Sequence, residues 1–368
     1  MRILVLEPYY GGSHRAVLDA ILPALGHDYD LLTLPASKWK WRMRGSAITM
    51  AEQARTLHAS GVQWDLVYAS TFINLAEFIA LAGPAVAGVP SIVYFHENQL
   101  VYPTRYTAEW DYQFPLTNIT SALVAGECLF NSNWTMDSFL DGIPAFLRQF
   151  PDHVPTGVTE RIAAKSRVLA PPFDPAPFDA APVVRGDRPR IAWPHRWEHD
   201  KDPQAFFAAV AELAAEGLDF EVAVLGQSFH DAHDEMTRAA APLGDRLVHM
   251  GEPGDREAYA ALLASADVAV STARNEFFGL AMIEACYAGC TPLVPDRLAY
   301  PEIYPVSYRY RRPGELVARL RSLVCEPPAP GAARRVAEAF TVGRMLPAYR
   351  EVFEQVVDAS REKGARTC

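Results

Sequence analysis

The sequence predicts an α/β protein with two doubly wound parallel sheets, each covered by helices on both faces. Short apolar runs alternate with segments of helical length along nearly the whole chain, which is the pattern of parallel strands joined by crossover helices. This rhythm stops in a proline-rich passage between residues 170 and 189 and then restarts with unchanged composition. A chain of 368 residues is also too long for one ordinary core, so we expect two domains facing each other across a cleft.

The first half of the chain contains six strand-like runs, with helical stretches between them near residues 13–25, 46–60 and 74–87. In order, the runs are RILVLE, DLLTLP, WDLVYAS, SIVYFHE, LFNS and RVLA. They are short and rich in branched and aromatic residues, as buried strands are. Residues 1–170 are therefore expected to form the N-terminal domain.

Prolines mark the limits of the second domain. The passage APPFDPAPFDAAPVVRGDRP argues against a helix or a central strand, so residues 171–189 are interpreted as a linker. Five further runs, RIAWPHR, FEVAVLG, RLVHMGE, ADVAVST and TPLVPD, predict a sheet within residues 190–340. After a second proline-rich break, CEPPAPGAA, we expect a terminal helix over 341–368 that packs back on the N-terminal domain.

The composition, with 50% hydrophobic and 21% charged residues, is typical of a soluble globular protein. No stretch approaches the ~20 apolar residues of a membrane span, and the opening MRILVLEPYY does not resemble a signal peptide. Five scattered cysteines indicate a reduced protein. We therefore expect a cytoplasmic protein without a membrane partner. The sequence does not determine its oligomeric state. The net charge of −10 argues against extensive nucleic-acid binding but permits a local basic site.

Two carboxylates, Glu276 and Glu284, lie eight positions apart in the run NEFFGLAMIEACYAGC. A helix is expected from about Gly279, which places Glu276 at the mouth of the sheet and Glu284 roughly two turns along. The N–H groups of Phe278, Gly279 and Leu280 would then lack helical acceptors and would attract an anion such as phosphate. Acids beside a phosphate site suggest a sugar nucleotide, and the alternative is a surface helix with an acidic start.

Arg196 and Lys201 follow the first strand of the second domain, in the run HRWEHDKDP. Their guanidinium and ammonium groups suit the diphosphate of a leaving nucleotide, whose charge grows as a glycosidic bond breaks. Alone, such residues are usually solvated loop charges. Doubly wound sheets bind ligands at the carboxyl ends of their strands, so the shared domain with Glu276 and Glu284 favours a functional role.

Polar residues also follow two strands of the first domain. Gly11 and Gly12 follow the first strand and open a helix, where glycine lets the backbone approach a ligand closely. The third glycine of a dinucleotide fingerprint is missing, which argues against an NAD-dependent oxidoreductase. His96 ends the fourth strand close to Asn98, and a structural role competes with a catalytic one for this histidine.

Basic and aromatic residues alternate directly after the second strand. They are Lys38, Trp39, Lys40, Trp41, Arg42, Met43 and Arg44. Charges for phosphates and flat faces for splayed bases suit loop or single-stranded RNA, whereas the alternative is a basic loop whose tryptophans pack inward. The run from Tyr308 to Arg312 repeats this chemistry in the second domain with weaker support.

Together these features resemble a known family. Glu276-x7-Glu284, Arg196-x4-Lys201, the strand-end His96 and two Rossmann-like halves resemble the retaining GT-B glycosyltransferases of family 4. Longer blocks look like those of the tRNA-queuosine mannosyltransferases, and they cover most of the chain. The blocks are LEPYYGGSHR, LTLPASKWKWRMRGSA, YFHENQLVYP, LFNSNWTMDSFL and FFGLAMIEACYAGCTPLVPDRLAYPEIYP.

The resemblance implies GDP-mannose as the donor and the cyclopentenediol of queuosine in tRNA(Asp) as the acceptor. Arg196 and Lys201 would bind the diphosphate, and Glu284 would bind the ribose. Glu276 and the amides after it would hold the transferred sugar, with His96 facing that sugar from the opposite domain.

The remaining assignments concern the first domain and metals. Gly11 and Gly12 would complete the donor site, and the run Lys38–Arg44 would meet the tRNA together with His96 and Asn98. The family needs no DxD metal site, so we expect no cofactor. Asp28-Tyr-Asp30 and Asp200-Lys-Asp202 match the DxD pattern but are interpreted as solvated loop residues, and the run His230 to Glu235 as a polar helix start.

Two alternatives stay open. A related glycosyltransferase with another sugar nucleotide, or with a lipid or glycan acceptor, would share every donor-site residue. A non-catalytic RNA-binding protein on the same scaffold would have no physical reason to keep Glu276, Glu284, Arg196 and Lys201 together.

Overall fold

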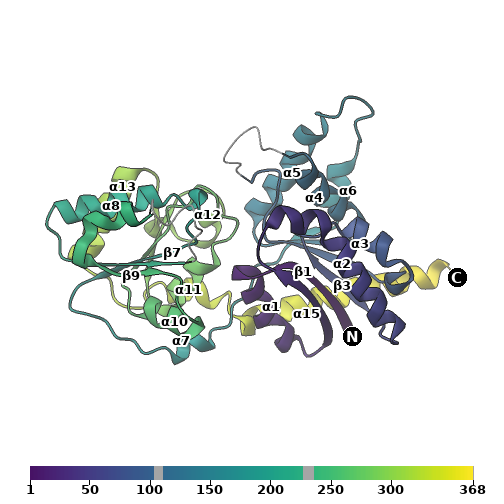
Figure 1. The fold of residues 1–368 in the computed structure, drawn as a ribbon, viewed down its shortest axis with the longest axis horizontal. Helices are drawn as coiled ribbons and strands as arrows, with labels where there is room; N and C mark the ends of the chain where they lie inside the picture. Colours follow the sequence, from purple (N-terminus) through teal and green to yellow (C-terminus); the bar gives the residue numbers. More distant parts are fainter. Residues whose placement is uncertain (103–110, 227–235, 368) are drawn as a thin grey trace. The chain divides into compact units, whose positions relative to one another are not determined.

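The structure is a computed structural model that describes residues 1–102, 111–226 and 236–367. The chain divides into two compact units: unit 1, Met1–Pro172 with Met345–Cys368, and unit 2, Phe173–Arg344. Each unit is α/β with one six-stranded sheet (Figure 1), as the sequence predicts. The predicted helix start in the polar run 230–235 lies outside the described residues.

The strands of unit 1 run parallel in the order β2-β1-β3-β4-β5-β6. They are β1 Arg2–Tyr10, β2 Asp28–Pro35, β3 Leu66–Ser70, β4 Ser91–Phe95, β5 Glu127–Phe130 and β6 Ser166–Val168. These are the six predicted runs. The direction of strand succession reverses between β1 and β3, and doubly wound sheets bind ligands beyond the carboxyl ends of strands at such a switch point.

Helices cover both faces of this sheet. They are α1 Gly12–Leu25, α2 Trp39–Ala59, α3 Leu75–Ala82, α4 Gln113–Val124, α5 Asn133–Leu147, α6 Val158–Ala163 and α15 Val342–Thr367. Successive residues of a strand point to opposite faces, so Leu4 and Leu6 of β1 pack with α2 to α6, while Ile3 and Val5 pack with α1 and α15. The C-terminal helix is therefore part of the core of unit 1.

Unit 2 contains the second parallel sheet, in the order β12-β11-β10-β7-β8-β9. Its strands are β7 Arg190–Pro194, β8 Glu221–Leu225, β9 Leu247–Gly251, β10 Val268–Val270, β11 Thr291–Pro295 and β12 Arg309–Tyr310. Counted along the chain, this is the 3-2-1-4-5-6 order of the Rossmann fold, and its switch point lies between β7 and β10. The sequence predicts every strand except β12, which has only two residues.

The helices of unit 2 separate into two layers (Figure 1). They are α7 Ala176–Ala180, α8 Pro203–Ala215, α10 Arg256–Ala264, α11 Leu280–Ala288, α12 Tyr300–Ile303, α13 Pro313–Cys325 and α14 Arg334–Glu338. Ile191 and Trp193 of β7 pack with α8 and α13. Helices α7, α10 and α14 contact α11 or one another on the other side of the sheet.

The structure corrects the predicted linker over residues 171–189. Helix α7 forms inside this passage because Pro177 falls in its first turn, where the missing proline N–H would have had no helical partner. Phe173 and Phe178 are buried, and the guanidinium of Arg256 lies 4.9 Å from the Phe178 ring. The passage is thus a folded part of unit 2.

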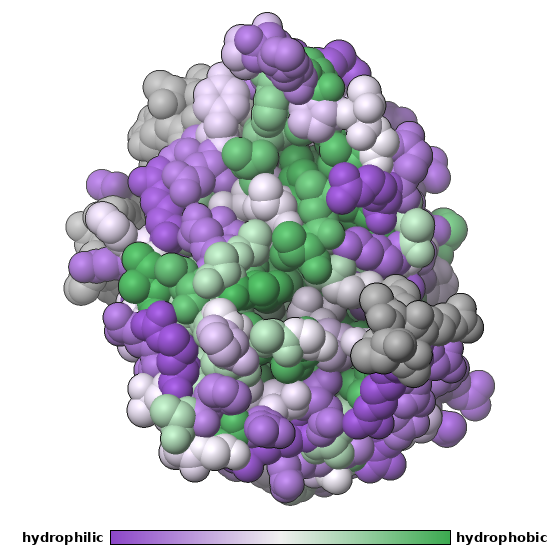
Figure 2. Space-filling view, turned by 90° about the vertical axis from the view of Figure 1, so that its right-hand side faces the viewer, coloured by the Kyte–Doolittle hydropathy of each residue, from purple (hydrophilic) through white to green (hydrophobic). Residues whose placement is uncertain are grey.

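No described helix has the length and apolarity needed to cross a membrane. Figure 2 shows apolar side chains gathered over the middle of the face it presents, with hydrophilic residues around them. The cysteines that the structure describes, Cys128, Cys286, Cys290 and Cys325, are all free thiols. This agrees with the predicted absence of a disulfide framework.

Candidate active site

Lys201 is the centre of the polar network in unit 2. It lies at the end of a short 3₁₀ turn, His199–Lys201, which follows β7 at the switch point of the sheet. Its Nζ donates to Asn275 O at 2.8 Å and to Glu276 Oε2 at 3.2 Å, and Asp200 Oδ2 is also 3.2 Å away. Burial alone would lower the pKa of Lys201, but the Glu276 and Asp200 carboxylates outweigh it, so the pKa is raised. The ammonium is therefore a fixed, permanent charge.

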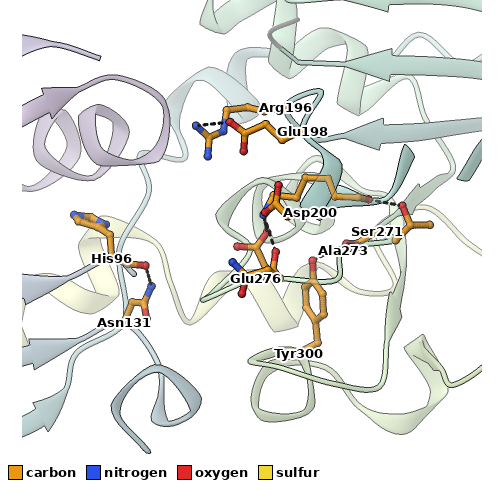
Figure 3. A network of polar contacts seen from close by, with 12 residues as sticks. His96, Asn131, Arg196, Glu198, Asp200, Ser271, Ala273, Glu276 and Tyr300 are labelled. Atoms are coloured by element: carbon orange, nitrogen blue, oxygen red, sulfur yellow. Dashed lines mark hydrogen bonds and ion pairs between the residues drawn. The ribbon is translucent and has the colours of Figure 1, made fainter. Parts of the chain in front are cut away.

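Backbone bonds join the loop after β7 to the loop after β10. Arg274 N and Asn275 N donate to Asp200 O at 2.7 and 3.2 Å, and Thr272 Oγ1 donates to Lys201 O at 2.8 Å. Figure 3 shows Asp200 and Glu276 converging at this junction. Two loops from neighbouring strands thus bring Lys201 and Glu276 together, although 75 positions separate them in the sequence.

The helix start predicted near Gly279 is confirmed, since α11 begins at Leu280 with Gly279 as its N-cap. Gly279 has φ 89°, a conformation that favours glycine, and an added Cβ would come within 3.0 Å of the Tyr300 ring. Among the described residues, no acceptor is found for the N–H groups of Phe278, Gly279 and Leu280. This helix start can therefore bind an anion.

Glu284 occupies the fifth position of α11, about one turn in rather than two, because the helix starts four residues after Glu276. Its side chain is buried, and its Oε1 accepts a hydrogen bond from Arg256 Nη2. Arg256 lies on α10 and also contacts the Tyr259 ring at 5.3 Å. The Arg256 guanidinium thus orients the carboxylate that we expected to hold the ribose.

Arg196 lies at the same strand end as Lys201. Its Nη1 is 3.5 Å from Glu198 Oε1, and the two side chains lie side by side in Figure 3. Burial raises the pKa of Glu198, while the charge of Arg196 opposes that shift. Next to them, burial and then the charge of Lys201 lower the pKa of His195 to about 3. The His195 ring is therefore neutral and adds no charge beside Lys201.

Asp200 and Asp202 are not the solvated loop residues that the sequence predicts. Both are buried, and Asp202 Oδ2 accepts from Arg274 Nε at 2.7 Å. Asp30, of the other DxD match, lies in β2 and accepts from Arg2 and Trp64. Each of these three aspartates pairs with a cation or an N–H donor of its own unit. The donor is supplied by the same loop or by a neighbouring strand or loop.

Unit 1 has its own polar cluster at the switch point between β1 and β3. Glu7 accepts hydrogen bonds from Tyr9 N at 2.9 Å and Ser70 Oγ at 3.0 Å, and His14 Nδ1 lies 3.1 Å from its other oxygen. A carboxylate can only accept, so Nδ1 of His14 carries a hydrogen and donates to Glu7. The rings of His14 and His96 lie 4.0 Å apart.

His96 is buried at the end of β4, and its backbone oxygen accepts from Asn131 Nδ2 at 2.7 Å (Figure 3). Its Nε2 has no hydrogen-bond partner among the described residues. Burial, followed by the nearby His14, lowers its pKa well below the usual value. Glu7, His14 and His96 offer ligand atoms within 4.8 Å of one another, but Glu7 is already engaged by three donors. We therefore interpret the cluster as one that fixes the two imidazole rings.

Two predicted contact residues of unit 1 have structural roles instead. Asn98 is fully buried, donates to Thr135 O and Ser138 Oγ, and accepts from the backbone of the turn after it. This corrects the expectation that Asn98 meets the acceptor directly. Gly11 is extended, and an added Cβ would lie 2.4 Å from Ala36 Cβ, so packing suffices to explain this glycine. Gly12 has φ 52° and open space around it.

The run Lys38–Arg44 forms the start of α2 and not a loop. The helix begins at Trp39, seven residues before the predicted start, because Met43, Ala47 and Met50 recur at helical spacing on its buried face. Lys38 precedes it with φ 53°.

The side chains of this run divide into two groups. Unit 1 itself holds three of them: the Trp39 ring packs 5.0 Å from Phe114, Arg42 donates to Pro35 O, and Arg44 pairs with Asp111. In contrast, Trp41 is 71% exposed, and Lys38 and Lys40 are exposed beside it. This second group presents a flat aromatic face and two cations to the solvent.

The sequence contained signals for some residues that were not singled out. Glu7 interrupts an apolar strand run, and a buried acid there requires donors. Asp200 stands beside Lys201 in the chain. Arg256 left no signal, since its role depends on α10 packing beside α11.

Two Rossmann-like units with a cation and carboxylate site at a helix start define a glycosyltransferase of the GT-B fold. Solved structures of this kind are similar to the chain. The HepE protein of Anabaena in complex with UDP has a TM-score of 0.69 at 16% identity, covering 96% of this chain and 100% of that chain. Sucrose-phosphate synthase of Thermosynechococcus elongatus has a TM-score of 0.71 at 16% identity, covering 98% and 100%. At such identities the likeness shows the fold alone.

The chain belongs to the tRNA-queuosine alpha-mannosyltransferase family. Residues 2–173 match the family described as tRNA-queuosine alpha-mannosyltransferase N-terminal, and residues 178–305 match Glycosyl transferases group 1. The tRNA-queuosine alpha-mannosyltransferase of Drosophila melanogaster is 36% identical over 373 residues, which cover 96% of each chain. A GDP-mannose-dependent alpha-(1-6)-phosphatidylinositol dimannoside mannosyltransferase of Mycobacterium tuberculosis is 33% identical over 138 residues, 36% of this chain and 35% of that protein. The protein is therefore an enzyme, a glycosyltransferase.

Proposed function

We propose that the protein transfers mannose from GDP-mannose to the cyclopentenediol of queuosine in tRNA(Asp), with retention at the anomeric carbon. The observation that carries this proposal is the Lys201 ammonium, held 3.2 Å from Glu276 beside the unpaired N–H groups at the start of α11. Membership of the tRNA-queuosine alpha-mannosyltransferase family supports the acceptor. The similarity to a mannosyltransferase named as GDP-mannose-dependent supports the donor.

The donor diphosphate binds to Arg196, Lys201 and the N–H groups of residues 278–280. These groups are fixed before the reaction, so they stabilise the charge that grows on the diphosphate as the glycosidic bond breaks. Glu276 holds a hydroxyl of the transferred sugar, and Glu284, oriented by Arg256, holds the ribose.

Transfer occurs on the face of the sugar that the diphosphate leaves. The acceptor hydroxyl forms the new bond while a phosphate oxygen of the leaving group takes its proton, so no side chain acts as a nucleophile. We assign the neutral His96 to the transferred sugar and Gly12 to close backbone approach. The cations and the helix start supply the positive charge, so the proposed reaction includes no metal.

The acceptor tRNA binds to unit 1. Trp41 offers a stacking face, and Lys38 and Lys40 lie beside it for phosphates. Trp39 and Arg44 support this surface by packing on Phe114. An enzyme that modifies tRNA works where tRNA is, so we propose a cytoplasmic location.

A direct test incubates the protein with GDP-mannose and queuosine-containing tRNA(Asp), followed by mass spectrometry of the nucleosides. The expected product is queuosine with one added hexose. The matched control is tRNA(Asp) that lacks queuosine, which should gain no hexose. If the protein binds GDP but no hexose is added to queuosine, the proposed acceptor is rejected.

The second candidate is a related transferase with another sugar nucleotide or with a lipid or glycan acceptor. The Mycobacterium tuberculosis relative, whose name states a phosphatidylinositol dimannoside acceptor, favours it to a limited extent, because the match covers only 36% of this chain. Repeating the assay with UDP-sugars and with lipid acceptors separates the two candidates. A non-catalytic RNA-binding role is excluded by turnover of any donor.

A further inference from the structure

Unit 2 contains a cavity of about 320 Å³ that the proposed reaction does not use. It lies at the carboxyl ends of β10, β11 and β12, on the side of the sheet that α8 and α13 cover. Glu276 instead leads into α11, on the other side. We call this space the arginine cavity, because its polar lining consists chiefly of Arg274, Arg297, Arg311, Arg312, Asp202 and Asp296.

The lining carries an excess of positive charge, with four arginines against two aspartates. Both aspartates are already paired. Asp296 accepts from Arg311 Nε at 2.8 Å and from Arg309 Nη1 at 2.6 Å, and Asp202 accepts from Arg274 Nε at 2.7 Å. The carboxylates thus orient these guanidinium groups instead of competing strongly for a ligand.

Two arginines keep donors available for a ligand. Arg297 donates its Nε and Nη2 to Ala273 O, at 3.2 and 2.9 Å, which fixes the group and leaves Nη1. No ion-pair or hydrogen-bond partner of the Arg312 side chain is found among the described residues. Arg312 is also the N-cap of α13, a helix of 13 residues, whose dipole adds to the positive potential. Oriented guanidinium forks match the oxygens of a phosphate group.

We propose that the arginine cavity binds a phosphate group, presented either by the backbone of an RNA or by free inorganic phosphate. Tyr310, Pro313 and Leu316 line its apolar part, and its volume falls within the range of ligand sites, roughly 300–1,000 Å³. The assignment of tRNA as the source rests on the proposed function, whereas phosphate binding by the cavity does not. The cavity gives a physical role to the basic run that ends at Arg312.

Arg312→Ser is the variant of choice. It removes the unpaired guanidinium, and serine is a favourable N-cap, so the variant should fold. Arg335→Ser is the matched control, since Arg335 is exposed on α14 and does not line the cavity. Arg274 is a poor choice because its side chain holds Asp202, the residue next to Lys201.

The first arm measures the melting temperature of the full chain in phosphate and in chloride at equal ionic strength, with saturating GDP to fill the donor site. Phosphate should raise the melting temperature of the wild type and of Arg335→Ser, and Arg312→Ser should lose this rise. The second arm measures tRNA affinity against salt concentration. Arg312→Ser should weaken binding about 3- to 10-fold and lower the salt slope by ~1.

If Arg312→Ser differs from the wild type in both arms, an RNA phosphate is the occupant. If it differs only in the phosphate arm, the occupant is a free anion. A response in the tRNA arm alone also supports the RNA backbone. If Arg312→Ser and Arg335→Ser behave alike in both arms, the proposal is overturned. The phosphate arm does not depend on mannose transfer, so failure of the wild-type transfer assay would reject the proposed function without bearing on phosphate binding by the cavity.

Discussion

The two units place different chemistry at the same position of the same kind of fold. At the switch point of unit 2, the buried Lys201 ammonium lies between the carboxylates of Asp200 and Glu276, beside a helix start with unpaired N–H groups. At the switch point of unit 1, Glu7 fixes His14, whose ring lies 4.0 Å from the ring of a neutral His96. The fold therefore determines where a binding site can form. The side chains at that place determine whether the site is suited to a diphosphate or to a neutral hydroxyl.

Burial lowers the pKa at both switch points, but the net shifts have opposite signs. In unit 2 the carboxylates outweigh burial and raise the pKa of Lys201, so the site keeps its charge. In unit 1 burial and the neighbouring His14 lower the pKa of His96, so that ring stays neutral. Substituting a residue of only one unit should therefore impair the chemistry of that unit and leave the other unit intact.

The largest effect is expected from Lys201→Ala. The buried ammonium would be lost, which leaves the buried carboxylate of Asp200 and the half-buried carboxylate of Glu276 without their shared cation. We expect kcat for mannose transfer to fall about 10²- to 10³-fold, the usual cost of removing one fixed charge-stabilising donor. GDP affinity, measured by calorimetry, should fall as well. The control Arg335→Ala also removes one positive charge and should retain both values.

Glu7→Ala should break the cluster of unit 1. Tyr9 N, Ser70 Oγ and His14 Nδ1 would lose their common acceptor inside the protein, and unsatisfied buried donors cost about 1–3 kcal/mol each. We expect the free energy of unfolding to fall by about 2–4 kcal/mol in urea, with faster hydrogen exchange in β1. Glu52→Ala, on the exposed face of α2, is the control. Equal stability of the two variants would show that the cluster does not stabilise unit 1.

Trp41→Ala tests the RNA surface of unit 1. Stacking of a base on an aromatic ring contributes about 1–3 kcal/mol, so tRNA affinity should fall roughly 10-fold. Thermal stability should stay the same because the side chain is 71% exposed. Tyr29→Ala removes another exposed aromatic ring of unit 1, and filter binding should show no effect for it. A loss of tRNA affinity shared by both variants would argue against a local stacking site.

The last prediction is a dependence of stability on pH, which is absent at neutral pH and develops only in acid. His195 has a pKa of about 3 in the folded chain and titrates near 6.5 when unfolded, so the unfolded chain binds the extra proton. Its contribution is complete above pH ~6.5 and is lost as the pH falls toward 3, by up to ~1.4 kcal/mol per pH unit. His195→Gln should therefore flatten the decline of unfolding free energy between pH 6 and 4. The exposed control His153→Asn should leave the slope unchanged.

The fold was predictable wherever a strand was buried on both faces. Such strands leave continuous apolar runs, and similar runs also identified the partly exposed edge strands β2, β6 and β9, so that eleven of the twelve strands were found. The two-residue β12 leaves no such run, because its pairing with β11 depends on the rest of the sheet. The early start of α2 was missed because basic and aromatic residues hide the spacing of Met43, Ala47 and Met50.

The candidate site was predictable where its residues lie close in the sequence. The spacing of Glu276 and Gly279 identified the helix start, and a strand end identified Lys201. The bond between Lys201 and Glu276 joins loops after different strands, and the pair of Arg256 with Glu284 joins different helices. Such contacts depend on packing, so one sequence could not reveal them.

The central claim is that the donor nucleotide binds at Lys201 of unit 2 and that the main stacking contact with the tRNA is made by Trp41 of unit 1. The most direct test measures GDP affinity and tRNA affinity side by side for Lys201→Ala and Trp41→Ala. We predict a crossed result: Lys201→Ala loses GDP binding and keeps tRNA binding, and Trp41→Ala does the reverse. If either variant lost both affinities to the same extent while remaining folded, this division between the units would be contradicted.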